Sequence, residues 1–200
     1  FVGGDLVIKG TDRRISLIDL AKRPAATLDM RKGEGEFTPP DATYPNGTHV
    51  AEVALDPETG VINITNYVIC DDFGRSVNPM LLAGQVHGGV AQGIGQALME
   101  RTVYDDEGQL LTASFMDYCM PRADSLPSYS FETRNVPSTT NPLGIKGAGE
   151  AGSIGSCPAV MNAVADVLRR NFGVTHIDMP ATPSRVFAAI RAAENKAAAE

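Results

Sequence analysis

A single carboxylate within a run of small residues is the feature of this sequence best suited to chemistry. The run is Asn141-Pro-Leu-Gly-Ile-Lys-Gly-Ala-Gly-Glu-Ala-Gly-Ser-Ile-Gly-Ser156, and its only acidic residue is Glu150. Small residues let backbone amides approach a ligand, and the helix expected next offers unpaired N–H groups to an anion. Glu150 is therefore a candidate acid or base beside a tightly bound group. The alternative is an acidic residue that merely stabilises the helix start.

Residues 147–152 of this run, Gly-Ala-Gly-Glu-Ala-Gly, also fit the G-x-G-x-x-G fingerprint of dinucleotide-binding domains. That fingerprint requires a buried strand directly before it and an acidic residue about 20 positions later at the end of a second strand. Prolines and polar residues precede this run instead, and Asp166 falls inside an expected helix. A nicotinamide-binding domain is therefore the disfavoured alternative.

A glycine-rich helix is the second candidate. It is expected to begin at Pro79, with Asn78 as its N-cap, and to end near Met99. Each interior glycine costs roughly 1 kcal/mol relative to alanine, so close approach of a backbone or a ligand must offset them. One interpretation is tight helix packing, and the other is that a glutamine near the helix start, such as Gln85, hydrogen-bonds a polar cofactor. Helical spacing places these residues on two adjacent stripes, Gly84, Gly88, Ala91 and Gly95 on one, and Gln85, Gly89, Gln92 and Gln96 on the other.

Composition narrows the function classes. The 200 residues are 43% hydrophobic and carry a formal charge of −7 without a basic stripe, which disfavours nucleic acid as a partner. We expect no membrane span and see no signal peptide. Three separated cysteines favour reduced thiols in the cytoplasm, and histidines without ligand spacing argue against a metal held by protein side chains.

Hairpins and helices that alternate without a βαβ rhythm predict an α+β fold. A central hairpin should join strands 49–55 and 61–69 through the turn 56–60, whose proline and glycine suit a tight reversal. A long helix should be capped by Ser156 and end at Arg169, Arg170 and Gly173. The other expected elements are strands at 6–9, within 101–111, at 129–134 and at 175–179, helices at 16–22 and 183–193, and a connecting arm at 25–46.

Two further residue sets look chemical but favour structural roles. Asp71 and Asp72 are adjacent in an extended segment, so their side chains should point to opposite faces and not share a proton. One of them is expected to be a turn or cap residue before Gly74. His87 is expected to be a helix histidine packed against a neighbour.

Taken together, the segments resemble the molybdenum-binding large subunit of the xanthine dehydrogenase, aldehyde oxidase and carbon monoxide dehydrogenase family. The resemblance covers roughly residues 47–189 and only the C-terminal portion of such subunits, which are several times longer. Phe73 stands where many members of the family have cysteine. The matching segments are 56–60, 72–75 with Asn78-Pro79, 84–95, 141–152, 158–164 and 176–185.

The resemblance implies a fold and a domain division. The fold would be the C-terminal molybdenum cofactor-binding domain of the aldehyde oxidase/xanthine dehydrogenase type, in which β-hairpins and a mixed sheet pack with helices. Residues 1–46 would be an N-terminal segment and connecting arm of a longer chain, 47–193 the molybdopterin cofactor-binding domain, and 194–200 a frayed alanine-rich tail.

The resemblance also implies chemistry: oxidation of an aldehyde, an N-heterocycle or a similar small molecule, with water as the oxygen source. Glu150 would be the catalytic base that takes a proton from the attacking hydroxyl. Gln85 would contact the pterin. Backbone amides near the metal would come from Lys146, Gly147, Ala148 and Gly149. Because the pterin holds the metal, the resemblance implies no metal-ligating side chain here.

The implied cofactor is a molybdenum–pterin group, in its molybdopterin cytosine dinucleotide form, held jointly with the N-terminal part of the same large subunit. The implied partners are that part and iron–sulfur and FAD subunits, because this chain has no cluster cysteines. The isolated chain is expected to be inactive. Two alternatives stay open, a nicotinamide dinucleotide-binding domain and a non-catalytic folding or interaction module.

Overall fold

The computed structural model describes residues 1–22 and 34–198, which belong to two compact units, Phe1–Pro39 and Pro40–Glu200. In the first unit, β1 (Asp5–Val7) pairs antiparallel with β2 (Arg14–Ser16). The helix α1 (Leu17–Ala21) follows within the predicted range 16–22, and Ser16 is its N-cap. Strand β2 was not predicted, and β1 ends at Val7 rather than at residue 9. Residues 25–33 of the predicted arm lie outside the described residues.

A three-stranded mixed sheet is the framework of the second unit. Strand β3 (Asn46–Leu55) pairs antiparallel with β4 (Ile62–Asp72), which pairs parallel with β5 (Tyr129–Thr133). The predicted turn joins β3 to β4, with Gly60 at a φ of 74° and the Thr59 hydroxyl donating to Asp56 at 2.6 Å. The hairpin is confirmed, but β3 begins before residue 49 and β4 continues past residue 69, through both aspartates.

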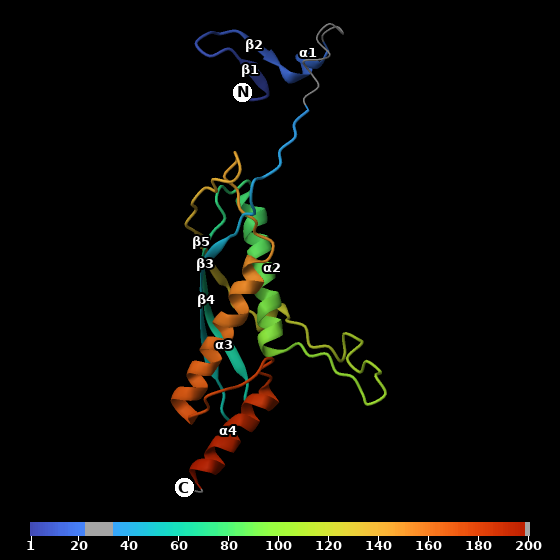
Figure 1. Cartoon of the computed structure of the whole chain (residues 1–200), viewed down its shortest axis with the longest axis vertical. Helices are drawn as coiled ribbons and strands as arrows, with labels where there is room; N and C mark the ends of the chain where they lie inside the picture. Colours follow the sequence, from blue (N-terminus) through green and yellow to red (C-terminus); the bar gives the residue numbers. More distant parts are fainter. Residues whose placement is uncertain (23–33, 199–200) are drawn as a thin grey trace. The chain divides into compact units, whose positions relative to one another are not determined.

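Two long helices, α2 (Pro79–Leu98) and α3 (Ala151–Phe172), run side by side against one face of the sheet (Figure 1). Helix α2 begins as predicted, with Asn78 Oδ1 accepting the Leu81 amide at 3.1 Å. The predicted start of α3 is wrong. Its N-cap is Glu150, and Ser156 is buried inside the helix. Pro158, a residue typical of a first helical turn, also lies inside the helix.

The close contact between α2 and α3 depends on two glycines. A Cβ at Gly93 would overlap Ser156 Oγ, and one at Gly89 would lie 3.0 Å from Gly152 Cα. Nothing lies within 4 Å of a Cβ built at Gly84 or Gly88, so these two glycines do not take part in the contact between the helices. Tight packing therefore explains Gly89 and Gly93 and leaves the first two glycines of the helix without a packing role in this structure.

The core lies between β4 and the helices, and α4 (Pro183–Ala197) closes one end of it. Helix α3 ends as predicted, at Gly173 with a φ of 69° after two arginines. Helix α4 continues to Ala197, beyond the expected residue 193, so the first part of the predicted tail is helical. The fully buried side chains include Tyr67, Ile69, Phe73, Val86, Val90, Ile94, Val160, Val164, Leu168, Val186 and Ile190.

Two predicted strands are absent, because neither segment lies beside a strand of the β3–β4–β5 sheet. Residues 101–111 contain only an isolated bridge between Tyr104 and Leu110, and residues 175–179 contain neither helix nor strand. The strand predicted at 129–134 is β5, which pairs with β4 instead of continuing a meander. Within the described residues, no helix is both long enough and apolar enough to cross a membrane.

Candidate functional site

The predicted site residues come from two segments that meet at the start of α3. Gln85 of α2 donates from Nε2 to the Gly149 carbonyl oxygen at 3.1 Å. The next residue, Glu150, is exposed, and its carboxylate does not cap the helix. Its carbonyl oxygen instead accepts the amide of Ile154 and the hydroxyl of Ser153, each at 3.0 Å. The structure thus brings Gln85, Gly149 and Glu150 together and leaves the carboxylate without a hydrogen bond to any described residue.

The glycine loop before α3 presents open backbone donors. Nothing lies within 4 Å of a Cβ built at Gly147 or Gly149, so both glycines face open space. Among the described residues, no acceptor pairs with the amides of Gly147, Ala148 or Gly149. Consecutive unpaired amides at a helix start bind anionic or carbonyl oxygens. The loop can therefore hold an oxygen-rich group beside the Glu150 carboxylate.

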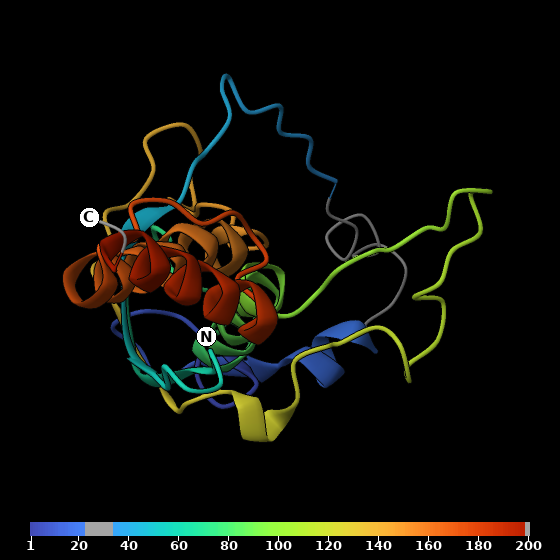
Figure 2. The ribbon, with the colours of Figure 1, turned by 90° about the horizontal axis from the view of Figure 1, so that it is seen from below.

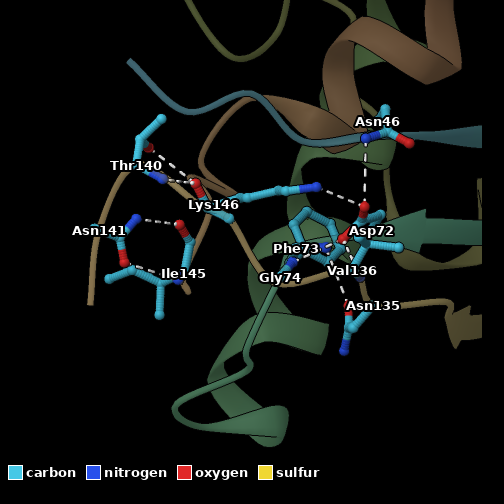
Figure 3. Close-up of polar contacts among 11 residues, drawn as sticks. Asn46, Asp72, Phe73, Gly74, Asn135, Val136, Thr140, Asn141, Ile145 and Lys146 are labelled. Atoms are coloured by element: carbon cyan, nitrogen blue, oxygen red, sulfur yellow. Dashed lines mark hydrogen bonds and ion pairs between the residues drawn. The ribbon is translucent and has the colours of Figure 1, made fainter. Parts of the chain in front are cut away.

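Asp72, at the end of β4, anchors the start of this loop (Figure 3). Its Oδ2 accepts from Lys146 Nζ at 2.6 Å, and its Oδ1 accepts the amides of Gly74 at 2.8 Å and Val136 at 3.0 Å. Burial opposes ionisation of Asp72, but these hydrogen bonds outweigh it and lower its pKa to about 2. The side chains of Lys146 and Asp72 are only 14% and 9% exposed, so the ion pair is shielded from water.

Backbone hydrogen bonds extend this anchor. The Lys146 amide donates to the Phe73 carbonyl at 3.0 Å, and Asn141 bonds both the amide and the carbonyl of Ile145, at 3.1 and 2.9 Å (Figure 3). Lys146 thus uses its amide and its ammonium group inside the fold, and the open amides begin at Gly147. A direct role of Lys146 in cofactor binding stays a prediction.

A buried polar cluster behind the start of α3 was not predicted from the sequence. His49 Nδ1 lies 2.9 Å from Tyr67 Oη, and its Nε2 lies 3.3 Å from Asp71 Oδ2. The side chains of His49 and Asp71 are 5% and 4% exposed. A Cβ at Gly155 would lie 2.6 Å from the His49 ring, so this glycine lets the imidazole pack against α3. The available signal was the period-two spacing that puts these residues on one sheet face.

The paired aspartates behave as predicted. Asp71 bonds His49, whereas Asp72 bonds Lys146 and accepts the Gly74 amide as the turn residue before that glycine. Tyr67 lies on the same face of β4 as Asp71, and burial raises the pKa of its hydroxyl.

His87 is packed against neighbours, as predicted. The centroid of its ring lies 5.2 Å from that of Tyr129 and 6.0 Å from that of Phe131. It therefore fills space between α2 and β5 and does not reach the Glu150 side of the site.

The dinucleotide fingerprint lacks its structural context. Residues 134–150 contain no strand, and the one βαβ unit of the mixed sheet, β4–α2–β5, ends at β5 before the glycine run begins. The arrangement that would place a pyrophosphate on a strand–loop–helix turn is absent from this run. The glycines instead serve the loop that meets Gln85.

Comparison with known proteins identifies the family of this chain. The family model described as "Molybdopterin cofactor-binding domain" matches residues 2–127. The nicotine 6-hydroxylase large subunit of Paenarthrobacter nicotinovorans is 37% identical over 195 residues, which cover 92% of this chain and 24% of that subunit. The chain therefore spans about a quarter of the length of this curated relative.

Solved structures show the same fold. A Cu,Mo-CO dehydrogenase superposes with a TM-score of 0.76 at 34% identity, over 79% of this chain and 20% of that one. Quinoline 2-oxidoreductase from Pseudomonas putida 86 superposes with a TM-score of 0.71 at 40% identity, over 74% and 19% of the two chains. The predicted resemblance and the mixed sheet packed with helices are confirmed. With a family match over more than half its length, the chain belongs to the molybdopterin cofactor-binding domain family of the molybdenum hydroxylases.

Proposed function

We propose that this chain is the cofactor-binding and catalytic-base part of a molybdenum hydroxylase large subunit. One observation carries the proposal: the hydrogen bond from Gln85 to Gly149 joins the glycine-rich helix to the loop that ends in the open carboxylate of Glu150. The family match, which includes Gln85 and ends at residue 127, supports molybdopterin as the cofactor of this domain. The relative's subunit is about four times longer, which supports a site completed by the rest of a large subunit.

The residues present fit such a cofactor. Gln85 donates one of its two amide hydrogens to the Gly149 carbonyl oxygen, and its Oε1 has no partner among the described residues. It can therefore offer one donor and one acceptor to the edge of a pterin. The open amides from Gly147 to Gly149 suit oxygen acceptors, and the missing Cβ atoms leave room for a close approach. The pterin would hold the metal, so the chemistry requires no histidine or cysteine ligand here.

When bound, the cofactor would supply the two-electron oxidation of the substrate, with water as the source of oxygen. Glu150 would accept the proton of the attacking hydroxyl on one carboxylate oxygen. A general base must lie within hydrogen-bond reach of that proton, and neither oxygen of Glu150 is committed to another described residue. The amides of residues 147–149 would orient the bound group, and Asp72 would hold the loop through Lys146.

The finer assignments belong to the same proposal. We expect an aldehyde, an N-heterocycle or a similar small molecule as substrate, and the names of nicotine 6-hydroxylase and quinoline 2-oxidoreductase support the heterocycle class. We further propose the cytosine dinucleotide form of the cofactor and electron transfer to iron–sulfur and FAD subunits. The free cysteines Cys70, Cys119 and Cys157 support a reducing, cytoplasmic setting.

The test uses the assembled enzyme, purified by means of an affinity tag on this chain. Molybdenum and pterin should co-purify with it, and Glu150→Gln should lower turnover at least ~100-fold while both contents stay unchanged. Glu132→Gln, on the opposite face of the sheet, is the matched control and should keep full turnover. Undiminished activity of Glu150→Gln would refute the base role. A preparation without molybdenum and pterin, indifferent to changes at Glu150, would instead identify a non-catalytic module.

A further inference from the structure

Residues 101–122 form an arm that projects away from the sheet and helices of the second unit (Figures 1 and 2). The arm leaves the end of α2 and returns to η3 (Ala123–Ser125) just before β5. The arm contains a second turn, residues 114–118, which we call the apolar tip; in it Phe115 and Met116 are 89% and 93% exposed. Adjacent large apolar side chains with this exposure are typical of an interaction surface.

Hydrogen bonds set the shape of the apolar tip, and burial does not. The Ser114 hydroxyl donates to Asp117 Oδ2 at 2.6 Å, and the Tyr118 amide donates to the Ser114 carbonyl at 2.9 Å. This closed turn spans Phe115 and Met116 and holds both side chains away from the arm. The apolar tip is therefore organised for contact before any partner arrives.

The base of the arm is tied to α2. The Tyr118 hydroxyl donates to Glu100 Oε2 at 3.1 Å, and a Cβ at Gly95 would lie 2.6 Å from Pro121 Cγ. A cavity of about 580 Å³ lies beside this base and is also lined by Gln92, Gln96 and Ser153.

We propose that Phe115 and Met116 are buried against another part of the same large subunit. This inference rests on the proposed function, in which the chain is one part of such a subunit. The chain matches 24% of the nicotine 6-hydroxylase large subunit, so in a protein of that length most of the polypeptide is tethered nearby at high effective concentration. An aromatic ring beside a methionine fits a permanent apolar pocket.

Charge disfavours a second copy as the occupant. The other turn of the same arm carries Asp105, Asp106 and Glu107, and the whole chain has a formal charge of −7. Two arms that met through these turns would bring their acidic residues toward one another, and like charges oppose such an association.

A photo-crosslinking amino acid identifies the occupant directly. Benzoylphenylalanine replaces Phe115 in the assembled enzyme, and the same amino acid at Asp106 is the matched control on the acidic turn. We expect position 115 to crosslink to another segment of the same large subunit with at least a tenfold higher yield than position 106. Crosslinks to a second copy or to a different subunit, or equal yields at the two positions, would overturn the proposal.

A second measurement separates docking from folding. Because both side chains are exposed, the double variant Phe115→Ser, Met116→Ser should leave the unfolding midpoint of the isolated chain unchanged. Mild proteolysis of the assembled enzyme can cut the subunit between this part and the rest. After the cut, this part should dissociate from the rest at least tenfold faster in the double variant than in the wild type. Unchanged release would refute docking. If position 115 crosslinks to the same subunit but the enzyme contains no molybdenum, only the proposed function is refuted. If the enzyme is active and contains molybdenum but position 115 does not crosslink, only this inference is refuted.

Discussion

The ammonium group of Lys146 lies 2.6 Å from Asp72 Oδ2 and joins the glycine loop to the end of the central strand. The loop that carries the candidate base is thus positioned by an ion pair that is largely shielded from water. Four hydrogen-bond donors converge on the Asp72 carboxylate, one from each of four segments: Asn46, Gly74, Val136 and Lys146. Removing its charge should therefore disturb the whole loop.

Asp72→Asn should destabilise the chain at pH 7 by about 2 to 4 kcal/mol, because the buried Lys146 charge loses its partner. Urea unfolding of the isolated chain measures this loss. Glu132→Gln, which changes an exposed carboxylate, is the control and should alter the unfolding free energy by less than about 0.5 kcal/mol. Equal effects of the two variants would contradict the anchoring role.

The same ion pair predicts a pH dependence. The pKa of Asp72 is about 2 in the folded chain, below its ordinary value of 3.8. Its ionised form therefore stabilises the fold fully above the unfolded pKa, and this contribution is lost as the pH falls through the folded pKa. The stability difference between wild type and Asp72→Asn should shrink between pH 4 and pH 2. A constant difference across that range would rule out the carboxylate as its source.

Two glycines of α2 should respond in opposite directions to alanine. Gly93→Ala should destabilise the chain by about 1 to 3 kcal/mol, because the new methyl group overlaps Ser156 Oγ. Gly84→Ala meets nothing within 4 Å and should stabilise the helix by about 1 kcal/mol. Thermal unfolding of the two variants compares the sites. A destabilising Gly84→Ala would show that space at this position is needed within the chain itself.

Gln85→Leu should weaken cofactor retention, since it removes the hydrogen bond to the Gly149 carbonyl and both polar groups offered to the pterin. Loss of one such bond corresponds to roughly a tenfold change in affinity. Molybdenum content after dialysis of the assembled enzyme measures the effect. Gln109→Ala, which removes an exposed glutamine from the arm, should retain the metal. Full retention by Gln85→Leu would remove Gln85 from the site.

The buried His49–Asp71 pair should matter more than its exposed counterpart. His49→Leu leaves Asp71, 4% exposed, without its partner and should cost about 1 to 3 kcal/mol of folding stability. His176 and Asp178 lie 3.0 Å apart but are 79% and 71% exposed, so His176→Leu should cost less than about 0.5 kcal/mol. Urea unfolding of both variants in parallel decides whether burial sets the difference.

Local signals predicted the parts of the fold that local interactions determine. The Asn78 cap, the 56–60 turn and the Gly173 stop each depend on residues within one turn, and all three are confirmed. The start of α3 could not be predicted in this way. A Cβ at Gly152 would overlap the Val86 carbonyl of α2, so packing against another helix extends α3 back beyond Ser156.

Contacts between distant segments explain what else the sequence left unresolved. Lys146 and Asp72 are 74 positions apart, and their contact requires β4 to extend past residue 69. His49 meets Tyr67 and Asp71 only through the strand register, which includes a bulge between Glu52 and Val53. The family resemblance selected Gln85 and Glu150 as site residues, and the structure supplies the hydrogen bond through Gly149 that connects their segments.

The contact between Gly93 and Ser156 leaves α2 and α3 no room to slide past each other. The spacing between the segment of Gln85 and the segment of Glu150 is therefore set by the packing of these two helices. In such an arrangement, the residues that select a substrate can differ from those that fix the position of Glu150. If the proposed function holds, substitutions in a substrate pocket formed by other parts of the subunit would leave the position of the candidate base Glu150 unchanged.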